Sequence, residues 1–108
     1  MSQTLILKNK HLVIGHELIE NYFGDVSYVF VKWVKESNHL LVAPHTASVF
    51  YQVHKDAMQM LLKTKNLQGD KSIALYDFFY ENNINENDNY HVEYQYLDKL
   101  KALKIKMI

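Results

Sequence analysis

The sequence contains no cysteine, no arginine, one proline and three glycines among its 108 residues. Without cysteine, the chain cannot hold a disulfide scaffold, an iron–sulfur cluster, a thiolate zinc site or a cysteine nucleophile. Without arginine, it lacks the side chain that makes the commonest specific contact with guanine. Twelve lysines balance twelve acidic residues, so the formal net charge is zero. This balance disfavours a nucleic-acid partner, because attraction to phosphates needs an excess of positive charge.

The chain also lacks a hydrophobic run long enough to span a membrane. The first ten residues, MSQTLILKNK, contain neither the basic region nor the apolar stretch of a signal peptide. We therefore expect a cytoplasmic protein without a membrane partner. Hydrophobic residues make up 48% of the chain and charged residues 22%, a composition that excludes intrinsic disorder. The length predicts a single domain, residues 1–108.

Hydrophobic periodicity predicts a mixed α+β fold. In the first half, strands and one helix alternate, and a glycine or turn residues separate them. The predicted elements are strands Thr4–Leu7 and His11–Ile14, a helix over Gly15–Phe23, and strands Val26–Val34 and His39–Ala43. A second helix is predicted over Lys55–Lys65, where Ala57, Met58, Leu61 and Leu62 share one face.

The second half repeats the order of the first. Lys10–Ile14 aligns with Lys71–Leu75, and Leu40 and Val42 align with Leu103 and Ile105. We therefore expect two β-α-β-β units, residues 4–44 and 71–108, that form a small β-barrel-like core joined by the helix over 55–65. One alternative stays open, because Ser72–Phe78 fits either an uninterrupted strand or a strand that runs into a helix.

The residues that could carry catalysis or bind a metal ion do not form a known pattern. The six histidines lack the close spacing of zinc ligands. Glu17 and Glu20 are neighbours on the first helix, but no nucleophile or apolar pocket accompanies them in the sequence. We therefore predict that the protein is not an enzyme and that it uses no cofactor or metal.

The predicted first hairpin is apolar on both faces. Val29, Val31 and Trp33 lie on one face of its first strand, and Tyr28 and Phe30 lie on the other. A soluble monomer rarely leaves such a surface in water. Either the helix over 55–65 or a second copy of the chain is expected to cover it.

A second candidate contact lies on the predicted helix of the second half. Phe78 falls where the first half has Glu17, so we expect it to project from a polar helix face. The sequence thus predicts a homodimer, with Val29, Val31, Trp33 and Phe78 as candidate interface residues.

The segment Lys10–Ile19, followed by a strand, a turn and the run Leu40–Pro44, resembles the swapped-hairpin domain of AbrB/MraZ-type bacterial regulators. The tandem copy resembles the MraZ branch in particular. The resemblance implies a barrel of interlocked units and DNA binding by basic residues near the first hairpin. This sequence departs from the family pattern at His11 and Ser72, where the family has arginine, and at Gly15 and Tyr76, where it has proline.

Two functions are therefore expected from the sequence. The first is a small bacterial non-enzymatic interaction or scaffold domain that associates with itself. The alternative is a divergent AbrB/MraZ-like DNA-binding transcriptional regulator, in which Lys8, Lys10 and Lys71 would contact DNA.

Overall fold

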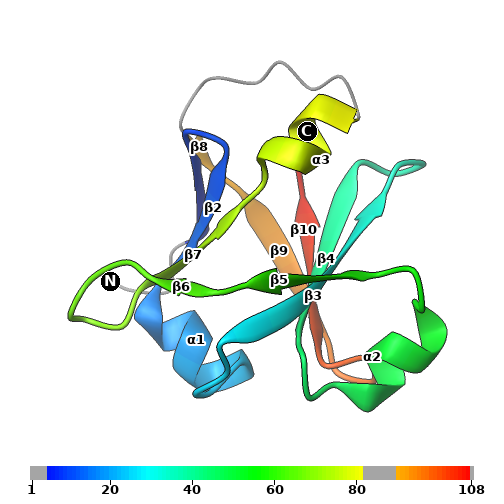
Figure 1. The fold of residues 1–108 in the computed structure, drawn as a ribbon, viewed down its shortest axis with the longest axis horizontal. Helices are drawn as coiled ribbons and strands as arrows, with labels where there is room; N and C mark the ends of the chain where they lie inside the picture. Colours follow the sequence, from blue (N-terminus) through cyan, green and yellow to red (C-terminus); the bar gives the residue numbers. More distant parts are fainter. Residues whose placement is uncertain (1–4, 82–89, 108) are drawn as a thin grey trace.

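Two antiparallel sheets and three short helices form the part of the chain that the structure, a computed structural model, describes: residues 5–81 and 90–107 (Figure 1). The first sheet has the strand order β6-β7-β2-β1-β8, and the second has the order β5-β3-β4-β10-β9. The α+β class predicted from the sequence is confirmed.

The first four strands and the strand that begins at Lys71 follow the predicted runs closely. The first sheet contains β1 (Leu5–Lys8), β2 (His11–Ile14), β6 (Lys63–Thr64), β7 (Lys71–Ala74) and β8 (Tyr90–His91). The second contains β3 (Tyr28–Val34), β4 (His39–Pro44), β5 (Met58–Leu61), β9 (Glu93–Leu97) and β10 (Ala102–Lys106). The helices are α1 (His16–Tyr22), α2 (Ser48–Val53) and α3 (Tyr76–Glu81).

The turn between β1 and β2 is a two-residue hairpin loop. Asn9 and Lys10 both have positive φ, at 51° and 61°. A turn with two such residues matches the twist of the strands, and asparagine tolerates this conformation better than most residues. The turn sets Lys8 opposite His11 and therefore fixes which side chains of the hairpin face the core.

Besides the connection through α1, which joins β2 to β3, the chain passes from one sheet to the other at two single buried residues. Leu62 separates β5 from β6, and Val92 separates β8 from β9. Their backbone N–H groups donate to Ser27 O and Leu5 O, so both crossings remain tied to neighbouring chain. The prediction of a barrel-like core is therefore wrong. The strands form two sheets instead of a closed barrel, because the strand pairing is interrupted at Leu62 and at Val92.

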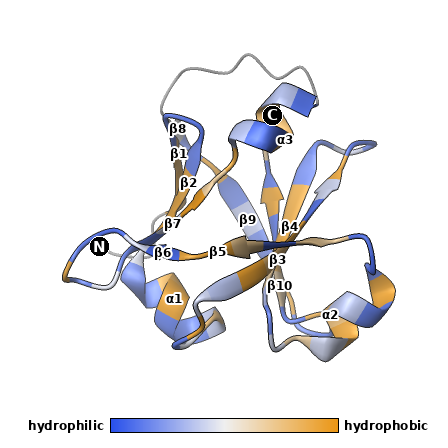
Figure 2. Ribbon diagram, viewed as in Figure 1, coloured by the Kyte–Doolittle hydropathy of each residue, from blue (hydrophilic) through white to orange (hydrophobic). Residues whose placement is uncertain are grey.

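The main hydrophobic core lies between the inner faces of the two sheets. Leu12, Ile73, Val42 and Leu103 are each fully buried in it. Residues of α1 and α3 pack against the same core, with Leu18 only 1% exposed. Figure 2 shows hydrophobic segments along the central strands and hydrophilic ones at the turns. Apolar side chains thus line the inner face of each sheet.

A second, smaller core lies on the outer face of the second sheet, under α2. Phe50 of α2 is fully buried there, with Leu41, Ala43, Ala47 and Ala102 around it. The inner face of the first hairpin is thus buried, but its outer face is covered only in part, because Tyr28 remains 44% exposed.

The prediction of a helix over Lys55–Lys65 is wrong. This segment forms β5 and β6, and the helix that covers the sheet is α2, which the sequence analysis did not predict. Leu61 and Leu62 fit a helical face, but β3 offers an unpaired edge, and β5 pairs with it from Tyr28↔Leu61 to Val31↔Met58. Strand pairing outweighs the local helical pattern here.

The open alternative at Ser72–Phe78 is resolved in favour of a strand that runs into a helix. β7 ends at Ala74, and α3 begins at Tyr76.

We expect Phe50→Ala to lower the free energy of unfolding by about 3–5 kcal/mol, because it leaves a cavity between α2 and the sheet. The matched control is Val49→Ala on the same helix, where the side chain is 49% exposed. It should change stability by less than about 0.5 kcal/mol. Urea unfolding followed by circular dichroism measures both variants, and equal losses would show that α2 is not held through Phe50.

Candidate functional site

The structure removes most of the predicted interface residues from the surface. Val29 is fully buried, Val31 is 1% exposed and Phe78 is 8% exposed, all within the main core. Trp33 is partly buried against the same core. The expectation that Phe78 projects from a polar face is wrong, because α3 is short and turns both Phe78 and Phe79 inward to close one end of the core.

The three lysines proposed for DNA contact do not form one patch. Lys8 lies on β1 and Lys10 in the following turn, on the side of the first sheet that faces away from the core. Lys71 lies at the start of β7, and its Nζ is 3.4 Å from Val26 O, beside the end of α1. A binding surface formed by all three residues is therefore not present.

Four apolar side chains of β3, β5 and α2 lie next to one another on the outer face of the second sheet. Tyr28 and Leu61 are cross-strand neighbours on β3 and β5, exposed by 44% and 45%. Phe30, two residues along β3, stacks on Tyr51 of α2 with ring centroids 5.0 Å apart. We call these four residues, Tyr28, Phe30, Tyr51 and Leu61, the outer strip. Tyr51 and Leu61 are not among the surface candidates predicted from the sequence, because α2 is not predicted there and Leu61 falls within the helix predicted over Lys55–Lys65.

The outer strip carries no formal charge. The next outward residue on β3 after Phe30 is Lys32, and its ammonium forms an ion pair with Asp56. The hydrogen bond from Lys32 lowers the pKa of the Asp56 carboxyl, although that carboxyl is solvent-exposed. The positive charge at the end of the strip is thus balanced within the chain.

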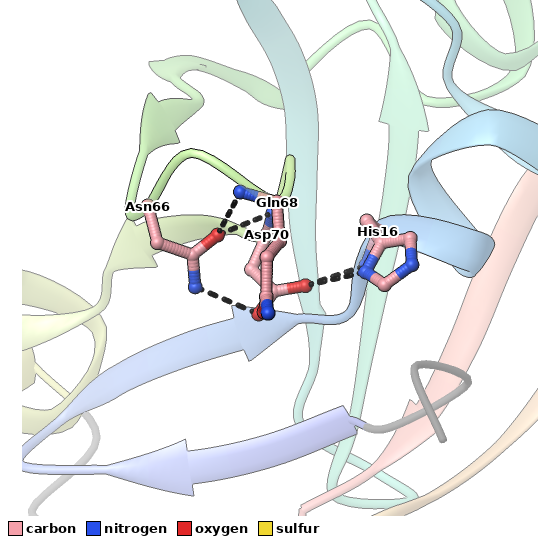
Figure 3. A network of polar contacts seen from close by, with 4 residues as sticks. All are labelled: His16, Asn66, Gln68 and Asp70. Carbon is pink, nitrogen blue, oxygen red and sulfur yellow. Dashed lines mark hydrogen bonds and ion pairs between the residues drawn. The ribbon is translucent and has the colours of Figure 1, made fainter.

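A polar clasp holds the start of α1 to the loop before β7 (Figure 3). Asp70 Oδ1 accepts hydrogen bonds from the backbone N–H of His16 at 2.8 Å and from His16 Nδ1 at 3.2 Å. The first N–H groups of a helix have no partner within the helix. Since Gly15, at the cap position, has no side chain to serve them, Asp70 supplies the cap from 54 residues away.

Asn66 shapes the loop that presents Asp70. Its Nδ2 donates to Asp70 Oδ2 at 2.9 Å, and its Oδ1 accepts the backbone N–H groups of Gln68 and Asp70 (Figure 3). Gly69 has a φ of +101°, and a Cβ there would lie 3.3 Å from His16 Cβ. The backbone conformation therefore favours glycine, and a Cβ there would crowd the start of α1.

These contacts set the charge state of the clasp. The hydrogen bond from Asn66 is the main cause that lowers the pKa of Asp70, with the bonds from His16 adding to it, while desolvation acts in the opposite direction. A shallow hollow of about 300 Å³ beside the clasp is lined by both acidic and basic residues, including Glu20, Asp25 and Lys71. The clasp therefore has a clear structural role, as a helix cap.

Neither a metal centre nor a membrane span is found in the part of the chain that the structure describes. Within residues 5–81 and 90–107, no three histidine or acidic side chains come together as a metal-binding group. No helix in the same ranges is long and apolar enough to cross a membrane.

Comparison with known proteins finds no matching family model, no matching curated protein and no matching solved structure.

We expect Asp70→Asn to lower the free energy of unfolding by about 1 kcal/mol at pH 7, through loss of the charged helix cap. Because folding lowers the pKa of Asp70, its contribution is present above about pH 4 and is lost as the pH falls through the folded-state pKa. The difference between the wild type and the variant should therefore shrink towards pH 3. Urea unfolding across this pH range measures it.

The control for this experiment is Asp56→Asn, which removes a carboxylate from an exposed ion pair. It should have a smaller effect at pH 7, because water screens the pair. An Asp70→Asn loss that stays constant down to pH 3 would contradict the role assigned to the carboxylate.

Proposed function

We propose that the protein is a non-enzymatic interaction domain that associates with itself through the outer strip. The observation that carries the proposal is the strip itself: Tyr28 and Leu61, paired across β3 and β5, and Tyr51, stacked on Phe30 from α2, are each nearly half exposed. Val49 and Val53 of α2 are also about half exposed and extend the apolar area of this helix. Contiguous apolar surface of this kind marks interaction sites.

A second copy of the chain suits this surface for an electrostatic reason. In a twofold dimer, the same patch meets itself, so any charged residue near the axis faces its own copy. The outer strip has only uncharged side chains, and Lys32 beyond its end is neutralised by Asp56. A self-contact therefore brings no like charges together. Stable interfaces bury about 800 Å² per partner, more than four side chains supply, so we expect a weak dimer that depends on concentration.

The proposed interface replaces the one expected from the sequence. Val29 and Val31 point into the core from β3, whereas Tyr28 and Phe30 alternate with them and point outward. The proposal keeps the expectation that the apolar hairpin contacts a partner. The face proposed for the contact is that of Tyr28 and Phe30, opposite the predicted face of Val29 and Val31.

We also propose that the two halves are repeats related by an internal twofold axis, as the resemblance to swapped-hairpin regulators implies. Support comes from the pairing of β2 with β7, which is centred on Leu12↔Ile73. Leu12 and Ile73 are equivalent in the sequence alignment of the halves. In the alignment, His11 is equivalent to Ser72, and Ala74 is equivalent to Val13. Replacing each residue of the pair His11↔Ala74 by its equivalent therefore gives the pair Ser72↔Val13, and both pairs occur in the sheet.

The pairing of β4 with β10 supports the same axis. It is centred on Leu41↔Lys104, and the flanking pairs are Leu40↔Ile105 and Val42↔Leu103. The alignment makes Leu40 equivalent to Leu103 and Val42 equivalent to Ile105. Replacing each residue by its equivalent therefore turns one of these two pairs into the other. Each half contributes a strand, a helix and further strands in the same order.

The repeat is tested by an experimental structure. We expect β2-α1-β3-β4 to superpose on the chain from β7 to β10 under a rotation of about 180°, as an isologous pairing requires. A rotation that brings β2 onto β7 but fails to bring β4 onto β10 would show that the two symmetric pairings are unrelated.

Self-association is tested by placing lysine at both members of the cross-strand pair, Tyr28→Lys with Leu61→Lys. Both side chains are nearly half exposed, so the variant should fold, and like charges across the twofold axis should make it monomeric. The control is Tyr80→Lys on α3, where the side chain is 86% exposed and lies outside the strip. Sedimentation velocity over a range of protein concentrations compares them with the wild type.

We expect concentration-dependent dimers of the wild type and of Tyr80→Lys, and monomers of the double variant. A wild type that stays monomeric at about 1 mM, where even weak association with a millimolar Kd becomes visible, would rule out the proposal. So would a folded double variant, checked by circular dichroism, that dimerises as the wild type does.

A further inference from the structure

A second surface, on the opposite side of the molecule from α2, gathers positive charge around a hollow. This hollow, of about 350 Å³, lies on the outward face of the first sheet. Its lining includes Lys8, His11, Lys65, Ser72 and Tyr76, and we call it the lysine hollow. None of the residues that line it carries a carboxylate.

The two lysines reach the hollow from different elements. Lys8 ends β1, and Lys65 follows β6, with β2 and β7 between these two strands in the sheet. Neither ammonium forms an ion pair with any residue of 5–81 or 90–107. Ammonium groups that lack a counter-charge and flank a common hollow attract an anion placed between them.

His11 and Tyr76 form a fixed edge of the hollow. The Nδ1 of His11 lies 2.9 Å from Asn9 O, which can only accept, so this nitrogen donates the hydrogen bond. The rings of His11 and Tyr76 pack edge to face with centroids 5.1 Å apart. These two contacts hold the imidazole in place, while the ring of Tyr76 remains 52% exposed.

The floor of the hollow supplies neutral groups that suit an anion. Ser72 and Val13 are cross-strand partners on β7 and β2, and both line the hollow. A serine hydroxyl can donate to a phosphate oxygen, and ammonium groups bind phosphate as point charges. An exposed aromatic ring beside these donors can stack on a nucleobase.

We propose that the lysine hollow binds a mononucleotide, with its phosphate between Lys8 and Lys65 and its base against Tyr76. The site is separate from the outer strip, which lies on the other sheet. The proposal therefore does not depend on self-association. With two exposed lysines and one stacking ring, the dissociation constant for adenosine monophosphate is on the order of 1 mM.

The test titrates ¹⁵N-labelled protein with adenosine monophosphate and follows the amide resonances by nuclear magnetic resonance. We expect saturable shifts centred on His11 and Ser72. The double variant Lys8→Gln with Lys65→Gln should bind at least fivefold more weakly. The control Lys55→Gln with Lys99→Gln changes the net charge equally at two exposed lysines outside the hollow and should leave the affinity within twofold.

Tyr76→Leu separates the two parts of the site. This substitution should lower the affinity for adenosine monophosphate several-fold and leave the affinity for inorganic phosphate unchanged, because only the nucleotide has a base to stack. An equal loss of affinity for adenosine monophosphate in the two double lysine variants would overturn the proposal, since it would show a general effect of net charge. The absence of saturable shifts with adenosine monophosphate would also overturn it.

A single-stranded oligonucleotide and a duplex of the same sequence complete the experiment. Saturable shifts of His11 and Ser72 with either polymer, but none with the mononucleotide, would overturn the proposal in favour of a nucleic-acid surface. Shifts with the mononucleotide that the polymers do not exceed support it.

Discussion

The burial of one apolar face from each sheet against the other is the constraint on which the rest of the structure depends. β1, β2 and β7 supply one side of this core, and β3, β4 and β10 supply the other. The chain can serve both sheets only if it crosses between them, and it does so through α1 and at the single buried residues Leu62 and Val92. The side chains of Leu62 and Val92 lie in the core, and their N–H groups donate to Ser27 O, just before β3, and to Leu5 O of β1. The inward side chains are thereby fixed, and the outward ones are left for other roles.

The two outward faces are used differently because their compositions differ. The outer face of the second sheet is apolar, so part of it is covered by α2 through Phe50 and part remains as the outer strip. The outer face of the first sheet is polar and contains the lysine hollow. A chain with zero net charge can still present a locally positive surface, because none of the residues that line this hollow carries a carboxylate.

The clasp at His16 shows how a residue far away in the sequence can cap a helix that lacks a cap of its own. α1 has seven residues and begins after a glycine, so its own sequence provides no side-chain cap. Asp70 provides one from a loop that Asn66 and Gly69 shape. Short helices of this kind are marginal alone and depend on such tertiary contacts.

The sequence by itself determined the α+β class, the first four strands, α1, and the alternation that places Val29 and Val31 on one face and Tyr28 and Phe30 on the other. These features follow from local periodicity and turn chemistry, which the order of residues contains directly. It did not determine β5 and β6, because Leu61 and Leu62 satisfy a helical and an extended pattern about equally, and only the free edge of β3 decides between them. Nor did it determine which face of the hairpin is inward, since both are apolar. That choice, the packing of Phe78 in the core, the separation of Lys71 from Lys8 and the placing of Lys8 and Lys65 around one hollow were decided by the tertiary structure. Each depends on which strands become neighbours in the sheets.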